Sequence, residues 1–477
     1  MKQSPIILLL LMITLSVFFV GQRAFAEKAS DAPYEIIPIG LDSGLLNGAE
    51  TDDPVFSQIV HVEGARWVRL HVADYDLGSE SYIRFTSQQD GSQQRHDSRS
   101  LQEWSNSSAF FNGDTVIVEL FASPGDKNVF VKIDSLFAGN ELVVGQSDST
   151  QSPESLCGPD NRVASNNQRH GRLSNLVSGP TCTVWLVSNG AVLTAGHCVD
   201  FDPDGPGPML PDGNLDLDQF SIVEFNVPAS LADGTPVFSA PAHQYPVNLG
   251  SVVWDYEGEN TVLGRDWAVL RVNRNADTRL LPHQGYGFER MVDISPNPGD
   301  LIRISGYGVD ITPPGSTGGA NAQSQTNQTN TGPFVARIQN GADIYYRYQV
   351  DTEGGNSGGP IIHTGSGFTV GIHTNGGCNP DGSGGNAGTA FQVDALEAAI
   401  QSVWGPQTRY VDFLRFNPVV VETGMIFQPF DRVAEAAAVV PNGGIVSIAA
   451  GIYPGPITID RPVTLIAPVG PVTIGGN

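Results

Sequence analysis

A serine enclosed by glycines is the residue of this 477-residue chain with the clearest chemical use. It is Ser357, in the stretch Thr352-Glu353-Gly354-Gly355-Asn356-Ser357-Gly358-Gly359-Pro360. Glycine tolerates backbone angles that other residues avoid, so such a segment can turn sharply and push the serine hydroxyl outward. The same turn can aim the amides of Gly355 and Ser357 at one point, where they would stabilise a negatively charged oxygen. The stretch therefore predicts a nucleophile beside an oxyanion hole.

A serine alcohol is a weak nucleophile at neutral pH, so it needs a histidine to accept its proton and a carboxylate to orient that histidine. Two upstream residues fit these roles. His197 lies in Thr194-Ala195-Gly196-His197-Cys198, after an apolar run between 184 and 193 that predicts a buried hairpin. Asp266 leads directly into an alternating strand pattern at 267–272. We expect folding to bring these two residues and Ser357 into one hydrogen-bonded row.

The three stretches TAGHC, DWAVL and GGNSGGP resemble the signatures of the trypsin/chymotrypsin-like serine proteases. They occur in that family's order of histidine, aspartate and serine, whereas the same triad has other orders on other folds. The resemblance implies a two-barrel antiparallel fold and hydrolysis of polypeptide substrates through an acyl-enzyme, with no cofactor and no metal. The alternative is an adhesion or glycan-binding surface protein with a vestigial protease domain.

A further resemblance concerns substrate choice. The string Val370-Gly371-Ile372-His373-Thr374-Asn375-Gly376-Gly377, with Thr352 before the nucleophile, is similar to the bacterial glutamyl endopeptidases. In those enzymes the matching histidine and threonine hold the carboxylate of the substrate residue before the cut bond. A histidine and a hydroxyl in a narrow slot suit a carboxylate through charge-assisted hydrogen bonds. The resemblance implies substrate-binding roles for Thr352, His373 and Thr374. A structural role for His373, or an endopeptidase of other specificity, is the alternative.

The stretch Ser155-Leu156-Cys157-Gly158-Pro159-Asp160-Asn161-Arg162 resembles the start of mature enzymes in that branch. Glu154 stands directly before it, so an enzyme that cuts after glutamate could release its own catalytic domain there. Asn356 departs from the family pattern, because trypsin-like zymogens have an aspartate in this place to capture the freed N-terminal amine. We therefore expect that activation switch to be absent.

The four cysteines are candidates for disulfide bonds if the chain is exported, and four cysteines allow three pairings. The family resemblance implies a bridge between Cys182 and Cys198, which flank the hairpin that carries His197. Cys157 and Cys378 do not match a pair typical of the family. If they pair, their bridge ties the start of the catalytic domain to the loop after His373 and braces the pocket.

Residues 1–26 are typical of a secretory signal peptide. They combine Lys2, an apolar run and the small-residue cleavage motif Ala24-Phe25-Ala26. A membrane anchor is the alternative, but the apolar run is short for a membrane span. The segment predicts secretion to an extracellular or periplasmic space, with no membrane attachment after its removal.

The remaining chain divides into three parts, which is the number of domains expected for a chain of this length. Residues 27–152 show short alternating strands and an Asn112-Gly113 turn, which predict a β-sandwich accessory or pro-domain. Residues 155–405 hold the protease-like motifs. Residues 406–477 resemble the opening coils of a right-handed parallel β-helix, a fold that needs about three coils to bury its core. These flanking β modules are candidates for docking on the protease domain.

Composition supports an all-β fold class, with 55 glycines, 33 prolines and few helical patterns. The predicted architecture is a two-barrel chymotrypsin-like protease domain preceded by a β-sandwich domain and followed by a short parallel β-helix-like segment. Within the protease domain, the polar, low-complexity residues 313–333 predict a surface loop before a strand at Phe334–Ile338. The helical spacing of Val393, Leu396 and Ile400 predicts a helix at the end of this domain.

The formal net charge of −25 excludes nucleic acid as a partner, because nucleic-acid binding needs a basic surface. It suits an exported protein with a well-hydrated surface. The same charge repels acidic peptides at low ionic strength, so we expect added salt to favour their cleavage. The aspartates between 202 and 218 predict a solvated loop. Calcium binding is the alternative, although their spacing matches no known calcium-binding loop.

Overall fold

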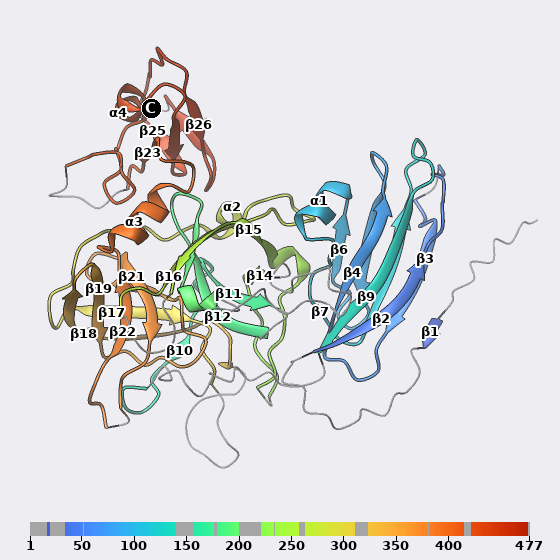
Figure 1. Cartoon of the computed structure of the whole chain (residues 1–477), viewed down its shortest axis with the longest axis horizontal. Coiled ribbons are helices and arrows are strands. Elements are labelled where there is room, and N and C mark those ends of the chain that lie inside the picture. The colour runs from blue at the N-terminus through green and yellow to red at the C-terminus, as the bar shows by residue number, and fades with distance from the viewer. Residues whose placement is uncertain are drawn as a thin grey trace, which may run out of the picture. The chain divides into compact units, whose positions relative to one another are not determined.

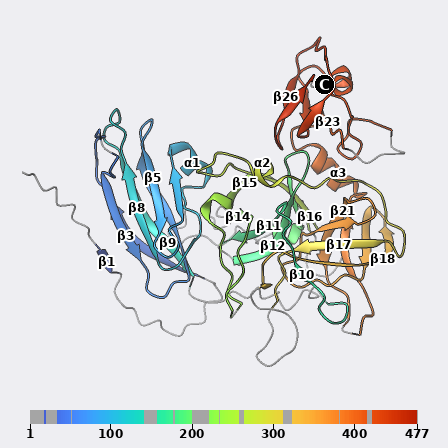
Figure 2. The same ribbon diagram turned by 180° about the vertical axis from the view of Figure 1, so that it is seen from behind.

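The computed structural model describes residues 17–19, 34–50, 52–139, 156–175, 179–199, 221–232, 234–256, 263–310, 323–379, 381–414 and 421–475. Most of the predicted signal peptide, the proposed cleavage site between Glu154 and Ser155, and the aspartates at 202–218 lie outside these residues. The chain divides into two compact units (Figures 1 and 2). None of the helices in the described part of the chain is long and apolar enough to cross a membrane.

The first unit contains two β-sheets, drawn in blue to teal in Figure 1. One sheet has the order β1 (Val17–Phe19), β3 (Phe56–His61), β8 (Thr115–Phe121), β5 (Tyr82–Ser87) and β6 (Gln93–His96). The other has the order β2 (Glu35–Asp42), β9 (Phe130–Gly139), β4 (Trp67–Asp76) and β7 (Phe111–Asn112). The short helix α1 (Ser98–Glu103) lies between β6 and β7 in the sequence. Strand β1, within the predicted signal peptide, pairs in parallel with β3.

The alternating patterns of this unit form strands, as predicted. Burial alternates along β5 and β8, which place Phe85 and Val118 in the core. The predicted Asn112-Gly113 turn is also present, and Gly113 has a φ of +92°, which favours glycine. Because β7 and β8 belong to different sheets, this turn carries the chain from one sheet to the other rather than closing a hairpin.

The second unit opens with a closed antiparallel barrel. Its order is β11 (His170–Asn175), β12 (Gly179–Leu186), β13 (Val192–Thr194), β16 (Trp267–Val272), β15 (Gln244–Asp255) and β14 (Ile222–Glu224). Short helical turns η3 (Pro241–His243) and α2 (Pro282–Tyr286) lie on either side of β15 and β16 in the sequence. The predicted buried hairpin is β12 with β13, and it leads into the turn η1 (Gly196–Cys198), which carries His197.

A second barrel follows within the same unit. Its order is β10 (Val163–Ala164), β18 (Gln328–Asn340), β17 (Leu301–Gly306), β20 (Pro360–His363), β21 (Phe368–Asn375), β22 (Asn386–Ala390) and β19 (Asp343–Tyr348). Pairing between β18 and β19 closes six of these strands into a ring. The predicted helix is α3 (Asp394–Gln401), which buries Leu396 and Ile400. The fold is therefore all-β with two six-stranded barrels, as predicted.

One sequence expectation about this barrel is wrong. The loop predicted to extend to Pro333 ends earlier, because β18 begins at Gln328. Residues Gln328 to Pro333 pair with β17 in regular antiparallel register. Backbone hydrogen bonds to a neighbouring strand do not require apolar side chains, so a polar, low-complexity segment can still complete a sheet.

The central strands of the first barrel bury both of their faces. One set of residues packs inside that barrel: Val184, Leu186, Val192 and Leu270. The alternate set joins the core of the second barrel: Trp185, Leu193, Trp267 and Val269. Burying one such side chain stabilises the fold by roughly 1.5–3 kcal/mol, so the shared core fixes one barrel against the other. Burial on both faces explains the nearly continuous apolar run in the sequence.

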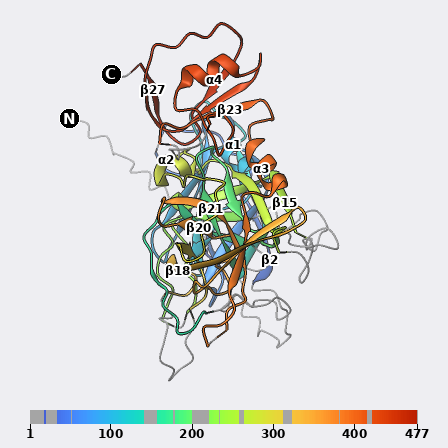
Figure 3. The same ribbon diagram turned by 90° about the vertical axis from the view of Figure 1, so that its left-hand side faces the viewer.

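The C-terminal part forms two small parallel sheets. They contain β23 (Thr408–Val411), β24 (Ile445–Ile448) and β26 (Thr464–Ile466) in one, and β25 (Gly451–Tyr453) and β27 (Val472–Ile474) in the other. Helix α4 (Val433–Val439) contacts β23 and β24 (Figure 3), and Val433, Val446 and Tyr453 belong to a common core. Parallel pairing is the arrangement that a parallel β-helix requires.

Helix α2 provides a prediction about pH. His283 is fully buried, and its Nε2 lies 2.9 Å from the carbonyl oxygen of Ala191. Burial lowers the pKa of His283 from 6.5 to about 4, outweighing the hydrogen bond to Ala191, which raises it. As the pH falls from 6.5 to 4, the unfolded chain therefore gains a proton at this residue before the folded chain does. Stability falls by up to about 1.4 kcal/mol per pH unit from this group alone.

We expect His283→Gln, which retains a donor but cannot titrate in this range, to flatten this loss. The measurement is urea unfolding of the wild type and the variant at several values between pH 6.5 and 4. Parallel curves of unfolding free energy against pH would contradict the assignment.

Candidate active site

His197 and Asp266 meet through two hydrogen bonds. Asp266 Oδ2 lies 2.7 Å from His197 Nδ1, and Asp266 Oδ1 accepts the His197 backbone amide at 3.0 Å. Only 4% of Asp266 is exposed, so water scarcely competes for these bonds. An ionised carboxylate only accepts hydrogen bonds, which places the proton of a neutral His197 on Nδ1 and leaves a lone pair on Nε2. This is the tautomer in which a histidine can act as a base.

Ser357 lies in a tight turn just before β20. Gly355 and Gly358 have φ values of +99° and +86°, which only glycine adopts without strain. A Cβ at Gly358 would overlap the carbonyl oxygen of Thr183 and the hydroxyl of Thr194. Thr183 also donates its amide to the Ser357 carbonyl at 2.8 Å and its hydroxyl to the Gly355 carbonyl at 2.7 Å. A strand of the first barrel therefore holds the serine turn of the second.

Two further carbonyls of this turn have fixed directions. Gly354 accepts a hydrogen bond from the Val309 amide at 2.8 Å, and Asn356 accepts one from the Gly359 amide at 2.9 Å. In a trans peptide unit the N–H points opposite to the C=O. The amides that share these peptide units, those of Gly355 and Ser357, consequently point away from both contacts. Their directions are set by the turn before any ligand binds.

Asn356 closes its own turn. Its side-chain Oδ1 accepts a hydrogen bond from the Glu353 backbone amide at 3.0 Å, and its own backbone amide donates to the Glu353 carbonyl at 2.9 Å. The start of the catalytic segment is held instead by Asp351, whose carboxylate accepts the amides of Cys157 at 2.8 Å and Asn161 at 3.0 Å. Asp351, which is 5% exposed, thus anchors the segment from Cys157 to Asn161.

His373 lies on β21 and is fully buried. The hydroxyl of Tyr348 lies 2.6 Å from His373 Nδ1 and donates to the Ala387 carbonyl at 2.7 Å. A tyrosine hydroxyl has one hydrogen, so both contacts are satisfied only if His373 Nδ1–H donates to Tyr348. In this tautomer Nε2 carries a lone pair when the ring is neutral and a hydrogen when it is protonated.

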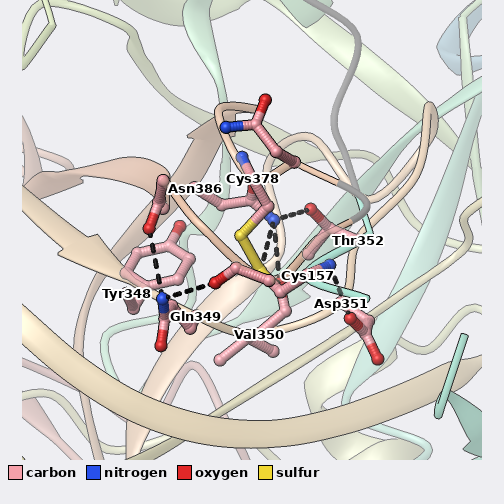
Figure 4. Close-up of a disulfide and its surroundings, with 12 residues drawn as sticks. Cys157, Tyr348, Gln349, Val350, Asp351, Thr352, Cys378 and Asn386 are labelled. Atoms are coloured by element: carbon pink, nitrogen blue, oxygen red, sulfur yellow. Dashed lines mark hydrogen bonds between the residues drawn. A yellow bond between two sulfur atoms is a disulfide. The ribbon is translucent and has the colours of Figure 1, made fainter. Parts of the chain in front are cut away.

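Thr352 is also fully buried, in the segment that precedes the serine turn. Its Oγ1 accepts a hydrogen bond from Asn386 Nδ2 at 2.8 Å, as Figure 4 shows. Thr374, the third predicted pocket residue, is 2% exposed and donates its hydroxyl to Asn375 Oδ1 at 2.7 Å. A ligand can therefore meet Thr352 or Thr374 only by entering below the protein surface.

Both pairs of cysteines raised by the sequence are bridged. Cys182 joins Cys198 with a Cα separation of 6.1 Å, and Cys157 joins Cys378 with a Cα separation of 4.9 Å. The first bridge removes two sulfur ligands from the cluster of Cys182, His197 and Cys198. In the described C-terminal residues, three carboxylates also lie close together, those of Glu422, Asp431 and Glu435. A cluster of partly exposed acids does not by itself define a metal site.

Four supporting residues could not be found from sequence motifs: Thr183, Tyr348, Asn386 and Thr389. Each makes a side-chain hydrogen bond to a motif residue or its backbone. Thr389 on β22, for example, donates its hydroxyl to the Asp266 carbonyl at 2.9 Å. Threonine, tyrosine and asparagine are common on strands and in turns, so no spacing pattern distinguished these four.

One family model matches part of the chain. Residues 182–372 match the family model for the trypsin-like peptidase domain, and this range contains His197, Asp266 and Ser357. No curated protein sequence matches the chain.

Similar solved structures cover about half of this chain. One is a Glu endopeptidase in complex with MPD, with 20% identity and a TM-score of 0.33, covering 51% of this chain and 96% of its own. Another is a thermostable serine protease from an extremophilic microorganism, with 15% identity and a TM-score of 0.33, covering 49% and 98%. A third is human heparin binding protein, with 15% identity and a TM-score of 0.32, covering 50% and 92%.

The family match begins in β12 of the first barrel and ends in β21 of the second, and it contains all three motif residues. Together with the two closed barrels, it defines the protein as a serine endopeptidase with a trypsin-like peptidase domain.

The serine turn provides a second prediction. Gly358→Ala should lower the free energy of unfolding by more than about 2 kcal/mol and abolish activity, because the new methyl group meets backbone at a positive φ. The matched control is Gly285→Ala in α2, where the structure leaves the new methyl group open space. Urea unfolding and peptide hydrolysis of both variants provide the comparison. Equal stability of the two variants would contradict the described turn.

Proposed function

We propose that Ser357 is the nucleophile, His197 the general base and acid, and Asp266 the group that orients and stabilises His197. The amides of Gly355 and Ser357 form the oxyanion hole in this proposal. The contact between His197 Nδ1 and Asp266 Oδ2 is the observation that carries it. That contact leaves Nε2 of His197 as the nitrogen able to accept the serine proton.

The reaction proceeds in two halves. Ser357 Oγ attacks the carbonyl carbon of the substrate while its proton passes to His197 Nε2, and Asp266 stabilises the imidazolium that forms. The carbonyl oxygen becomes an oxyanion and accepts hydrogen bonds from the two amides. Collapse of this intermediate breaks the C–N bond, and His197 returns the proton to the leaving amine. Water then attacks the acyl-enzyme by the same steps and releases the acid.

Cleavage after glutamate, and more weakly after aspartate, is the specificity that we assign. Thr352 and His373 supply a hydroxyl and an imidazole that are both enclosed by protein. A carboxylate entering this site loses its hydration, so hydrogen bonds from charged or polar donors must replace it. Since Tyr348 engages Nδ1 of His373, only Nε2 can donate to the carboxylate, and it does so when the ring is protonated. Thr374, adjacent on β21, is assigned to the same substrate-binding wall.

The other parts of the chain are assigned from sequence. Residues 1–26 direct secretion, and residues 27–152 form an accessory or pro-domain ahead of the protease at 155–405. Cleavage after Glu154 by the enzyme itself would separate these two parts. Residues 406–477 form a β-helix-like module, a proposal supported by the parallel pairing of β23 with β24 and of β24 with β26.

The direct test of catalysis uses a panel of peptides that differ only in the residue before the cut: Glu, Asp, Lys and Phe. We expect the wild type to prefer Glu, then Asp. Ser357→Ala should lower kcat about 10⁶-fold, because it removes the nucleophile. Asp266→Asn should lower kcat about 10⁴-fold, because asparagine stabilises the wrong tautomer of His197.

Two outcomes of the panel would contradict parts of the proposal. Residual cleavage by Ser357→Ala at the wild-type rate would remove Ser357 as the nucleophile. A preference for Lys or Phe would retain the mechanism and replace the glutamate assignment with another specificity.

A separate prediction concerns the pocket. Thr352→Val removes a hydroxyl while retaining shape, so kcat/KM for the Glu peptide should fall about ten- to a hundredfold, the usual effect of losing a hydrogen bond to a charged group. A peptide with Gln before the cut should lose less, because its side chain has the same shape without the charge. Equal losses on both peptides would show that Thr352 does not recognise the carboxylate.

A further inference from the structure

Asn386, at the start of β22, connects three segments around Thr352 (Figure 4). Its Nδ2 donates to the Val350 carbonyl at 2.8 Å and to Thr352 Oγ1 at 2.8 Å. Its Oδ1 accepts the Cys378 amide at 3.0 Å. Nδ2 also lies 3.9 Å from Cys157 Sγ. Asn386 is fully buried, so these contacts are shielded from water. One side chain therefore ties β22, the segment before the serine turn and the disulfide-bonded loop together.

The orientation of this amide is determined by its neighbours. Nδ2 has two hydrogens and faces two oxygen acceptors, while Oδ1 faces a backbone N–H. If the amide were reversed, its oxygen would face the Val350 carbonyl oxygen at hydrogen-bond distance, and its NH₂ group would face the Cys378 N–H. Both contacts would then be repulsive, which fixes the assignment of oxygen and nitrogen.

This orientation determines what the Thr352 hydroxyl can do. Its oxygen already accepts a hydrogen bond from Asn386, so its own hydrogen remains available for donation. Among the residues that the structure describes, no acceptor takes that hydrogen. A buried hydroxyl without an acceptor is unfavourable, and a carboxylate that enters the pocket would relieve this.

We propose that Asn386 is a positioning residue for substrate selection, which holds the Thr352 hydroxyl as a donor directed at the side-chain carboxylate of the substrate. This inference rests on the proposed role of Thr352 in binding that carboxylate. Asn386 touches neither the substrate nor the reacting atoms. It acts by occupying the acceptor side of the Thr352 oxygen.

The disulfide supports the same arrangement. Cys378 supplies the amide that anchors Asn386 Oδ1, and its sulfur is bonded to Cys157. The Cys157 amide in turn donates to Asp351, the residue next to Thr352. The disulfide therefore links the two partners of one hydrogen bond, the donor Asn386 and the acceptor Thr352, through a closed ring of contacts.

The test compares two substitutions of Asn386 that retain its approximate size. Asn386→Asp replaces the NH₂ group with an oxygen, which would accept the Thr352 hydrogen and turn the hydroxyl away from the substrate. Asn386→Leu removes both polar atoms, so the Thr352 hydroxyl is no longer held as a donor and can rotate. The readout is the ratio of kcat/KM for the Glu peptide to that for the matched Gln peptide.

We expect the ratio to fall about ten- to a hundredfold in Asn386→Asp and by a smaller factor in Asn386→Leu, since one charge-assisted hydrogen bond is lost. The ratio is measured on a single preparation, so it does not depend on the fraction of molecules that fold. Even a poorly folding variant therefore gives a value. In the Thr352→Val background, Asn386→Leu should leave the ratio unchanged, because Asn386 acts through the hydroxyl.

The matched control is Asn330→Leu. The Asn330 side chain accepts the Asp351 amide at 3.0 Å, beside Thr352 but without a contact to its hydroxyl. It should lower stability and leave the Glu-to-Gln ratio at the wild-type value.

The outcomes separate the two levels of the proposal. A wild-type ratio near one would remove the glutamate assignment itself. A high wild-type ratio that survives both Asn386 substitutions would overturn only the role of Asn386. An equal fall in Asn330→Leu, or an undiminished effect of Asn386→Leu in the Thr352→Val background, would also overturn it, since each indicates a general structural effect.

Discussion

The buried carboxylate of Asp266, with His197 held against it by two hydrogen bonds, is the constraint on which the proposed chemistry depends. One bond goes to the imidazole and the other to the backbone of the same residue, so both the ring and the loop that carries it are positioned. A carboxylate without these bonds would be costly to bury. The arrangement thus requires that the end of β13 and the start of β16 stay side by side, as their antiparallel pairing ensures.

The two barrels secure this arrangement reciprocally. Thr183 of the first barrel fixes two carbonyls of the serine turn in the second, and Thr389 of the second barrel fixes the Asp266 carbonyl in the first. Strands of the first barrel bury alternate side chains in the two hydrophobic cores, and this burial provides most of the stabilisation between the barrels. Hydrogen bonds between the barrels then set the direction of each group. The proposed substrate-binding residues are held in the same way: Tyr348 contacts His373, and Asn386 donates to Thr352.

The two-barrel fold and the three motif residues could be predicted from the sequence, because the residues that indicate them lie close together in the chain. Ser357 has glycines where positive φ is required, and His197 and Asp266 adjoin strands with clear apolar patterns. The limits have physical causes as well. Asn386 lies 34 residues from Thr352, and a hydrogen bond between segments so far apart in the chain leaves no pattern in the sequence. Strand β18 begins in a polar segment because backbone pairing, rather than apolar side chains, stabilises its first residues.

The most direct measurement of the central claim is labelling of the protein with a serine-directed phosphonate, followed by mass spectrometry of the modified peptide. The proposed row of side chains predicts a single label on Ser357 and a rate at least about a hundredfold lower in His197→Ala, since the serine then lacks its base. A label on another residue, or an equal rate in His197→Ala, would contradict it.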